Sequence, residues 1–314
     1  MKKFVAILLT LMLVLGVSAA FAEGTSLTDA SFNKVYAEEG GTAPAATFTF
    51  TAAPAGSGDG ATGDGPALTI SNVEARGAGT YPAKITPVTD FPTVGKYYYN
   101  VSETQGNVAG ITYDASALYL MVLVTNGDNG TLVPSYYLYT NNDMLAKQDT
   151  FTNTYKAGKL NISKTVTGNL GDKTKYFEFT VTLTGEADKT YGESYAVSGG
   201  SPDAHNPTSI KIGEETTFRL KDGDTISIAN LPYNVGYKVT ETAVDGYTTT
   251  VGNVETNVAE GTITAAETTA AFTNDRGGQI DTGVTTESLP YVVLMGFVVL
   301  AGAALLLKRK AHNN

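Results

Sequence analysis

The chain has 314 residues, with 31 acidic against 21 basic side chains and a formal net charge of −10 at pH 7. This acidic balance argues against nucleic acid as a partner, because nucleic-acid-binding surfaces are basic. The sequence has no cysteine and so no disulfide, and its two histidines, His205 and His312, are too few for a zinc site or a histidine-based catalytic triad. We therefore expect neither a cofactor nor a metal.

The N-terminal segment has the layout of a secretion signal. Lys2 and Lys3 precede an apolar run at residues 4–17, and mostly small residues follow it up to Ala22. The run is shorter than the roughly 20 residues that a membrane-spanning helix needs. The sequence therefore predicts a signal peptide at residues 1–22, cleaved after Ala22, and a secreted remainder.

Strand-like segments recur along the secreted part. They alternate or run apolar, are rich in Thr, Tyr and Val, and are separated by Gly, Asn, Asp and Pro turns. No long segment has the helical period. The pattern predicts an all-β fold built of sandwiches, and the clearest segments are residues 47–50, 97–101, 118–124, 136–139, 177–183, 225–228 and 237–240.

A weak internal repeat indicates two domains. Tyr-Asn-Val-Ser-Glu-Thr at residues 99–104 resembles Tyr-Lys-Val-Thr-Glu-Thr at 237–242, and Phe-Thr-Asn occurs at both 151–153 and 272–274. Each copy also has a lysine in its first strand, so the order Lys, Glu, Asn occurs twice. We expect two tandem immunoglobulin-like β-sandwich domains, at residues 23–156 and 157–278, with the joint near residues 156–159.

The repeated polar residues fall on apolar strand faces. Residues two apart in a strand share a face, so Lys34 shares the face of Phe32 and Tyr36. A lysine or a glutamate is rarely buried without a partner, because removing an isolated charge from water is costly. The sequence thus predicts two buried clusters, made of Lys34, Glu103 and Asn153 in the first copy and of Lys164, Glu241 and Asn274 in the second.

Such a cluster can be reactive. Burial lowers the pKa of a lysine, and a neutral amine is a nucleophile. A protonated carboxyl can donate a hydrogen bond to the carboxamide oxygen of an asparagine and shuttle a proton. Attack of the amine on the carboxamide carbon, with loss of ammonia, would give an amide crosslink. The alternative is that the clusters are buried ion pairs with neighbouring polar residues.

The C-terminal segment has three parts. Gln-Ile-Asp-Thr-Gly at residues 279–283 is followed by a polar spacer, an apolar stretch at 291–307 and the basic residues Lys308, Arg309 and Lys310. The apolar stretch can just span a bilayer, and the basic cluster holds the tail on the cytoplasmic side. This layout predicts a transmembrane sorting helix within residues 279–314, with a plain single-pass anchor as the alternative.

The repeated clusters together with this tail resemble the two-domain backbone pilins of the streptococcal type. The resemblance covers nearly the whole chain after residue 22. In that family a first-strand lysine joins a last-strand asparagine through an isopeptide bond, with a glutamate between them as catalyst. The resemblance thus implies Lys34–Asn153 and Lys164–Asn274 bonds, catalysed by Glu103 and Glu241.

The resemblance also implies that the chain is a sortase substrate. Sorting signals of these pilins resemble Gln-Val-Pro-Thr-Gly, which places cleavage between Thr282 and Gly283. Asp281 replaces the proline, which leaves the class of sortase open. The family places its linking lysine shortly before the asparagine of the first domain. Lys147 lies six residues before Asn153 and is therefore the expected acceptor, with Lys156 and Lys159 as alternatives.

The function that this resemblance implies is the shaft subunit of a pilus, secreted and anchored to the cell wall. Its expected partners are sortase, further copies of itself, minor pilins, peptidoglycan and host surface ligands. A monomeric wall-anchored adhesin built from the same domains is the alternative. No hydrolase nucleophile with its base is present, so we expect no turnover enzyme, only a single internal reaction in each domain.

Overall fold

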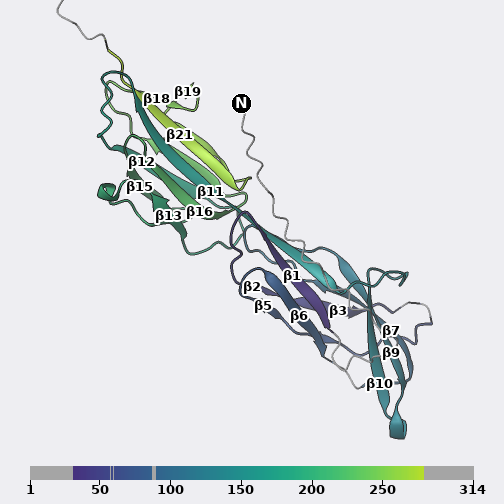
Figure 1. Ribbon diagram of the computed structural model, residues 1–314. Coiled ribbons are helices and arrows are strands. Elements are labelled where there is room, and N and C mark those ends of the chain that lie inside the picture. Colours follow the sequence, from purple (N-terminus) through teal and green to yellow (C-terminus); the bar gives the residue numbers. More distant parts are fainter. Residues whose placement is uncertain (1–30, 57, 59, 87–89, 279–314) are drawn as a thin grey trace, which may run out of the picture. The chain divides into compact units, whose positions relative to one another are not determined.

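The computed structural model describes residues 31–56, 58, 60–86 and 90–278 (Figure 1). The expected signal peptide, Thr282, Gly283 and the expected sorting helix lie outside the described residues. The described part is built of strands, with short 3-10 turns at Asp128–Gly130 and Pro202–Ala204. Among these residues, no helix is both long and apolar enough to cross a membrane. The all-β expectation is confirmed.

The described chain divides into two compact units. Unit one holds residues 31–37, 43–106 and 111–154, apart from the gaps named above, and unit two holds residues 38–42, 107–110 and 155–278. The long strand β11 (Thr150–Thr167) contributes its first five residues to unit one and the rest to unit two. Each unit thus uses part of β11.

Unit one is a sandwich of two main sheets. One sheet has the antiparallel order β10-β9-β7-β3, with β3 Phe50–Pro54, β7 Gly95–Glu103, β9 Ala117–Asn126 and β10 Leu132–Tyr139. The other runs β11-β1-β6-β4, with β1 Ser31–Glu39, β4 Thr69–Ile70 and β6 Gly79–Thr86, and β8 (Ile111–Thr112) also pairs with β11. A small pair is formed by β2 (Ala46–Phe48) and β5 (Val73–Ala75).

Unit two repeats this plan. Its four-stranded sheet has the order β15-β12-β17-β20, with β12 Phe177–Thr184, β15 Glu215–Leu220, β17 Gly236–Glu241 and β20 Val258–Thr262. In the facing sheet β11 lies between β16 (Thr225–Pro232) and β21 (Glu267–Asp275). The remaining strands are β13 Tyr195–Gly199, β14 Ser209–Ile210, β18 Thr248–Val251 and β19 Val254–Glu255.

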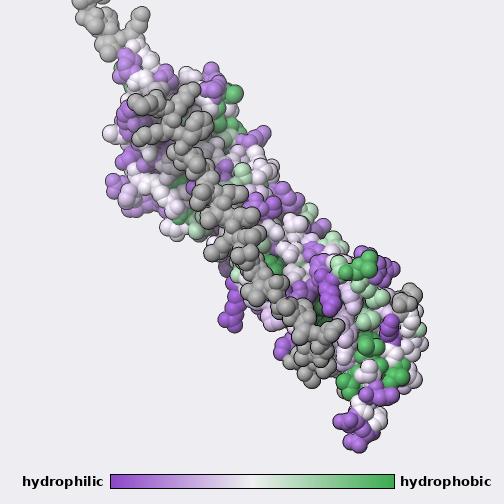
Figure 2. Space-filling view, turned by 45° about the vertical axis from the view of Figure 1, so that its right-hand side comes forward, coloured by the Kyte–Doolittle hydropathy of each residue, from purple (hydrophilic) through white to green (hydrophobic). Residues whose placement is uncertain are grey.

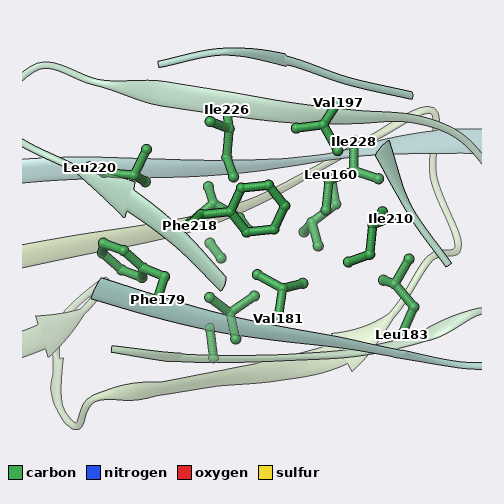
Figure 3. Packing of buried hydrophobic residues seen from close by; sticks show 14 of the residues in the cluster. Leu160, Phe179, Val181, Leu183, Val197, Ile210, Phe218, Leu220, Ile226 and Ile228 are labelled. Carbon is green, nitrogen blue, oxygen red and sulfur yellow. The ribbon is translucent and has the colours of Figure 1, made fainter. Parts of the chain in front are cut away.

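Alternating side chains build the core of unit two. In β12 every second residue from Phe177 to Leu183 is buried, because successive side chains in a strand point to opposite faces. Figure 3 shows Phe179, Val181 and Leu183 of β12 in one layer with Phe218 of β15 and with Ile226 and Ile228 of β16. The result is a dry apolar layer, and β11 borders it through Leu160 and Ile162.

Aromatic rings hold the two sheets of unit one together. The Phe32 ring on β1 lies edge-on to Phe50 of the facing sheet, at 4.9 Å between centroids, and to Phe151 of β11, at 5.3 Å. Edge-to-face pairs of this kind add to the stabilisation from buried area. They place the central strands β1 and β11 directly over the edge strand β3.

The surface is largely polar. In the face seen in Figure 2, hydrophilic and intermediate colours cover most of the described atoms. Within the described residues, the large hydrophobic side chains that stay exposed are scattered through both units: Val94, Val133, Leu145, Leu170 and Val254. This surface fits an acidic chain that faces water.

Candidate functional site: two buried Lys-Glu-Asn clusters

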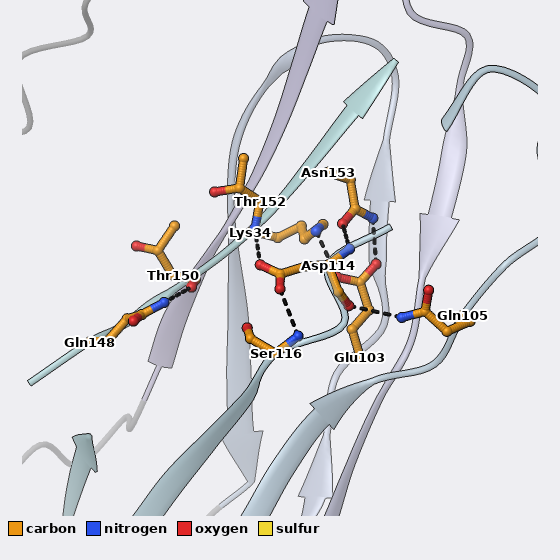
Figure 4. A network of polar contacts seen from close by, with 9 residues as sticks. All are labelled: Lys34, Glu103, Gln105, Asp114, Ser116, Gln148, Thr150, Thr152 and Asn153. Atoms are coloured by element: carbon orange, nitrogen blue, oxygen red, sulfur yellow. Dashed lines mark hydrogen bonds and ion pairs between the residues drawn. The ribbon is translucent and has the colours of Figure 1, made fainter. Parts of the chain in front are cut away.

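The first cluster joins the two sheets of unit one. Lys34 comes from β1 and Asn153 from β11, whereas Glu103 is the last residue of β7 in the facing sheet. All three are buried, with exposed fractions of 0%, 0% and 5%. The Lys34 Nζ atom donates to Glu103 Oε2 at 2.7 Å, and Asn153 Nδ2 donates to Glu103 Oε1 (Figure 4). One carboxylate therefore holds both the amine and the carboxamide.

The second cluster has the same plan in unit two. Lys164 lies on β11, Asn274 on β21 and Glu241 at the end of β17 in the facing sheet. Their exposed fractions are 1%, 0% and 0%. Lys164 Nζ donates to Glu241 Oε2 at 3.0 Å and to Oε1 at 3.2 Å, and Asn274 Nδ2 donates to Glu241 Oε1. The structure thus brings together all six residues singled out by the repeat.

Strand geometry explains how the three residues of each cluster meet. Each lysine follows an apolar residue by two positions, as Lys34 follows Phe32, so the alternation that buries the aromatic ring also buries the amine. At least one aromatic ring also lies close to each amine. Lys34 Nζ lies 4.9 Å from the centroid of the Phe48 ring, and Lys164 Nζ lies 4.4 Å from that of Phe177.

This burial changes the acidity of both lysines. Removal from water lowers the pKa of Lys34 and of Lys164, and the hydrogen bonds and charges of Glu103 and Glu241 oppose this shift without cancelling it. The more distant carboxylates of Asp114 and Asp222 oppose it further. Each amine is therefore easier to deprotonate than an exposed lysine, which is what a nucleophilic lysine requires.

The clusters contain the groups that an internal amide exchange needs. An amine, a carboxamide and a carboxylate that contacts both lie in a core from which water is excluded. A carboxylate in this position can take a proton from the amine and give one to the leaving nitrogen. Among the described residues, no group of His, Asp and Glu side chains is arranged to hold a metal ion.

Sequence reasoning missed one residue of the first cluster. The sequence predicted that a protonated Glu103 donates to the carboxamide oxygen of Asn153. In the structure the backbone N–H of Asp114 donates to that oxygen, at 2.7 Å (Figure 4). Asp114 lies in the loop between β8 and β9. Its residue type gave no signal, because the contact is made by the backbone and because loop conformation does not follow strand periodicity.

The three candidate acceptor lysines have different surroundings. Lys147 is exposed and lies in the segment after β10, where it forms an isolated antiparallel bridge with Tyr139. Lys156 and Lys159 lie on β11 and are partly exposed. Lys156 pairs with Glu39 at 2.9 Å, and Lys159 pairs with Glu267 at 3.3 Å. Thr282 and Gly283, to which one of these lysines would be joined, lie outside the described residues.

Comparison with known families matches both halves of the chain. A model described as a Spy0128-like isopeptide containing domain matches residues 30–156. A second model, for a domain of unknown function, matches residues 158–276. The first match includes Lys34, Glu103 and Asn153, and the second includes the other three cluster residues.

Comparison with individual proteins points the same way. The chain is 32% identical over 269 residues to a pilin of Streptococcus pyogenes serotype M1, covering 77% of this chain and 76% of that protein. It is 35% identical over 133 residues to the pilus tip adhesin Cpa of Streptococcus pyogenes, covering 41% of this chain but 18% of the adhesin. The crystal structure of the major pilin from Streptococcus pyogenes is 25% identical, with a TM-score of 0.56 over 80% of this chain and 99% of that one.

Proposed function

The chain belongs to the pilin family that carries the Spy0128-like isopeptide domain, and from this premise we propose that it is the shaft subunit of a pilus. In this proposal sortase joins the subunits covalently and anchors them to the cell wall. Each β unit is locked by an isopeptide bond that forms without any other protein. The protein is then a structural subunit, and the relatives reported above that it matches over most of its length are pilins.

One observation carries the proposal. In both units a buried lysine amine and a buried asparagine carboxamide contact the same buried glutamate. A single cluster of this kind would fit an ordinary buried ion pair. The same three residue types occur in the same strand positions of two units, in a chain without a cysteine. This repetition favours a shared chemical purpose.

The three side chains of a cluster supply every proton and bond that the reaction needs. In unit one, a proton passes from the Lys34 ammonium to Glu103, which leaves a neutral amine. Nζ then attacks Cγ of Asn153, and the electrons of the C=O double bond move onto Oδ1. Glu103 gives its proton to Nδ2 and takes one from Nζ, the Cγ–Nδ2 bond breaks, and ammonia leaves. The products are an amide between Lys34 and Asn153 and a protonated Glu103, and the same steps apply to unit two.

The free-energy cost of burying two charges favours formation of the amide bond. Before the reaction each core holds an ammonium and a carboxylate, and the desolvation of such a pair can cost as much as their attraction returns. After the reaction the core holds a neutral amide and a neutral carboxyl group that can hydrogen-bond to it. Loss of ammonia to solvent makes the step effectively irreversible.

The bond would also stabilise each unit strongly. The crosslinked residues are about 120 apart in unit one and about 110 apart in unit two, and closing a loop of ~100 residues with a disulfide is worth about 4.7 kcal/mol through the unfolded chain. This is comparable to the whole stability of many domains. Unlike a disulfide, an amide is not broken by reductants.

We place the joint between subunits at Lys147. Sortase would cleave between Thr282 and Gly283 and transfer the threonine acyl group to this lysine of the next copy. Lys147 is exposed, whereas Lys156 and Lys159 lie on β11 and are partly covered by their neighbours. The proposal also includes transfer of the last subunit to peptidoglycan and linkage to minor pilins. It extends to contact with host ligands at the cell surface.

A monomeric wall-anchored adhesin is the second candidate. The similarity of 133 residues of the chain to part of a pilus tip adhesin favours it. Blotting of cell-wall extracts separates the two functions. A shaft subunit gives a ladder of SDS-resistant species that is lost in Lys147→Ala and persists in the control variants Lys156→Ala and Lys159→Ala. A single discrete band in the unaltered strain would support the adhesin.

A further inference from the structure

The two clusters differ at the oxygen of the reacting asparagine. In unit one, Asn153 Oδ1 accepts the backbone N–H of Asp114 at 2.7 Å. In unit two, Asn274 Oδ1 is buried, and no donor among the described residues reaches it. A buried oxygen without a donor is costly, and it becomes more so when negative charge develops on it.

This oxygen is where charge develops in the proposed reaction. When the lysine amine adds to the carboxamide carbon, the electrons of the C=O double bond move onto Oδ1. A preorganised N–H aimed at such an oxygen stabilises the transition state, as in the oxyanion holes of acyl-transfer enzymes. The Asp114 amide is already at hydrogen-bonding distance before the reaction begins.

Asp114 is fixed from several sides. Its side-chain oxygens accept the backbone N–H groups of Thr152, at 2.8 Å, and of Ser116, at 2.9 Å. Its carbonyl oxygen accepts Gln105 Nε2 at 2.8 Å, as Figure 4 shows. Because Thr152 directly precedes Asn153, the side chain ties the loop to the strand that carries the reacting carboxamide.

We propose that the backbone amide of Asp114 is a catalytic group that stabilises the oxyanion formed on Asn153 Oδ1, while the Asp114 side chain and Gln105 position it. This inference rests on the proposed isopeptide bond and adds a group to its site. It also makes the two units unequal, because the bond in unit two would form without such a donor among the described residues.

An ester replacement tests the amide itself. Malic acid incorporated in place of Asp114 during cell-free translation of the full chain keeps the side chain and replaces the N–H by oxygen. Samples are quenched in acid over time, digested, and examined by mass spectrometry for the peptides crosslinked at Lys34 and at Lys164. The second bond of the same chain serves as an internal control.

Loss of one oxyanion donor should slow the first bond by about 10²- to 10³-fold, with the second bond unchanged. Asp114→Asn keeps the N–H but loses one of the two side-chain acceptors that position it, so it should slow the first bond by about fivefold, far less than the ester. Gln105→Ala changes an exposed side chain that contacts the Asp114 carbonyl, and it should slow the first bond alone by about fivefold. This variant provides a second test in a chain whose core is untouched.

Two results would overturn the inference. The first is an ester chain whose Lys34–Asn153 bond forms at the unaltered rate, and the second is an Asp114→Asn chain that is slowed as much as the ester chain. Absence of both bonds from the unaltered chain is a different failure, because it would remove the isopeptide proposal itself.

Discussion

Lys164 and Asn274 lie two residues apart in the register of the parallel pair β11–β21, where Lys164 is opposite Phe272 and Asn274 is opposite Val166. The two side chains point into the same core and contact the same carboxylate. A bond between them would join neighbouring strands that are already hydrogen-bonded. It would therefore form without any rearrangement of the sheet.

Removal of the second bond should destabilise unit two. Asn274→Ala is expected to lower the free energy of unfolding by about 4 to 5 kcal/mol, because the chain between residues 164 and 274 regains its freedom when unfolded. Chemical denaturation of the purified secreted segment, residues 23–282, measures the change. Asn142→Ala, at an exposed loop position, is the control. Equal stability of the two variants would contradict the proposed crosslink.

The Asp114 carboxylate should make stability depend on pH. Burial raises the pKa of Asp114, but hydrogen bonds from Ser116 and Thr152 and, before the crosslink forms, the charge of Lys34 outweigh it, so the pKa lies below the ordinary value of 3.8. A depressed carboxyl pKa contributes stability above 3.8 that is lost as pH falls through the folded-state value.

Thermal unfolding of the unaltered chain and of Asp114→Asn tests this dependence. The unaltered chain should melt at the higher temperature near neutral pH, and its advantage should shrink as pH falls below 3.8. An advantage that stays constant down to the lowest pH would show that the aspartate hydrogen bonds do not distinguish the two ionisation states.

The two bonds should carry force differently. If tension enters at Lys147 and leaves at Thr282, it runs through Asn153 to Lys164, crosses to Asn274 and exits. Most of unit two is then shielded, and the first bond lies outside the path. Asn274→Ala should therefore lengthen a pulled subunit by roughly 35 nm, the contour length of the freed residues, whereas Asn153→Ala should not.

The sequence offers convenient handles for this experiment. It contains no cysteine, so Lys147→Cys and Thr282→Cys give two unique attachment points for single-molecule force spectroscopy. The chain without further substitutions serves as the reference. Equal lengthening in the two asparagine variants would contradict this path of tension.

Strand periodicity was enough to predict the members of both clusters. Alternation places Lys34 with Phe32 and Asn274 with Phe272, and the repeated order of residue types indicated which lysine, glutamate and asparagine belong together. The continuity of β11 was not predicted. The sequence indicated a joint between domains near residues 156–159, and β11 runs through these residues as one strand from Thr150 to Thr167.

The contact of Asp114 could not have been found from the sequence. Its N–H reaches Asn153 from a loop, across 39 positions of the chain, and a backbone donor has no residue type to recognise. The orientation of the carboxamide was equally out of reach, since either its oxygen or its nitrogen could face the glutamate. Only the arrangement of three strands and one loop determines which atom does so.

Intact mass spectrometry of residues 23–282 tests the central claim most directly. Two internal amide bonds, each formed with loss of ammonia, predict a mass about 34 Da below that of the encoded segment, and Glu103→Gln or Glu241→Gln should halve this deficit. A purified segment with the full encoded mass would contradict the claim and leave two buried ion pairs in an ordinary β protein.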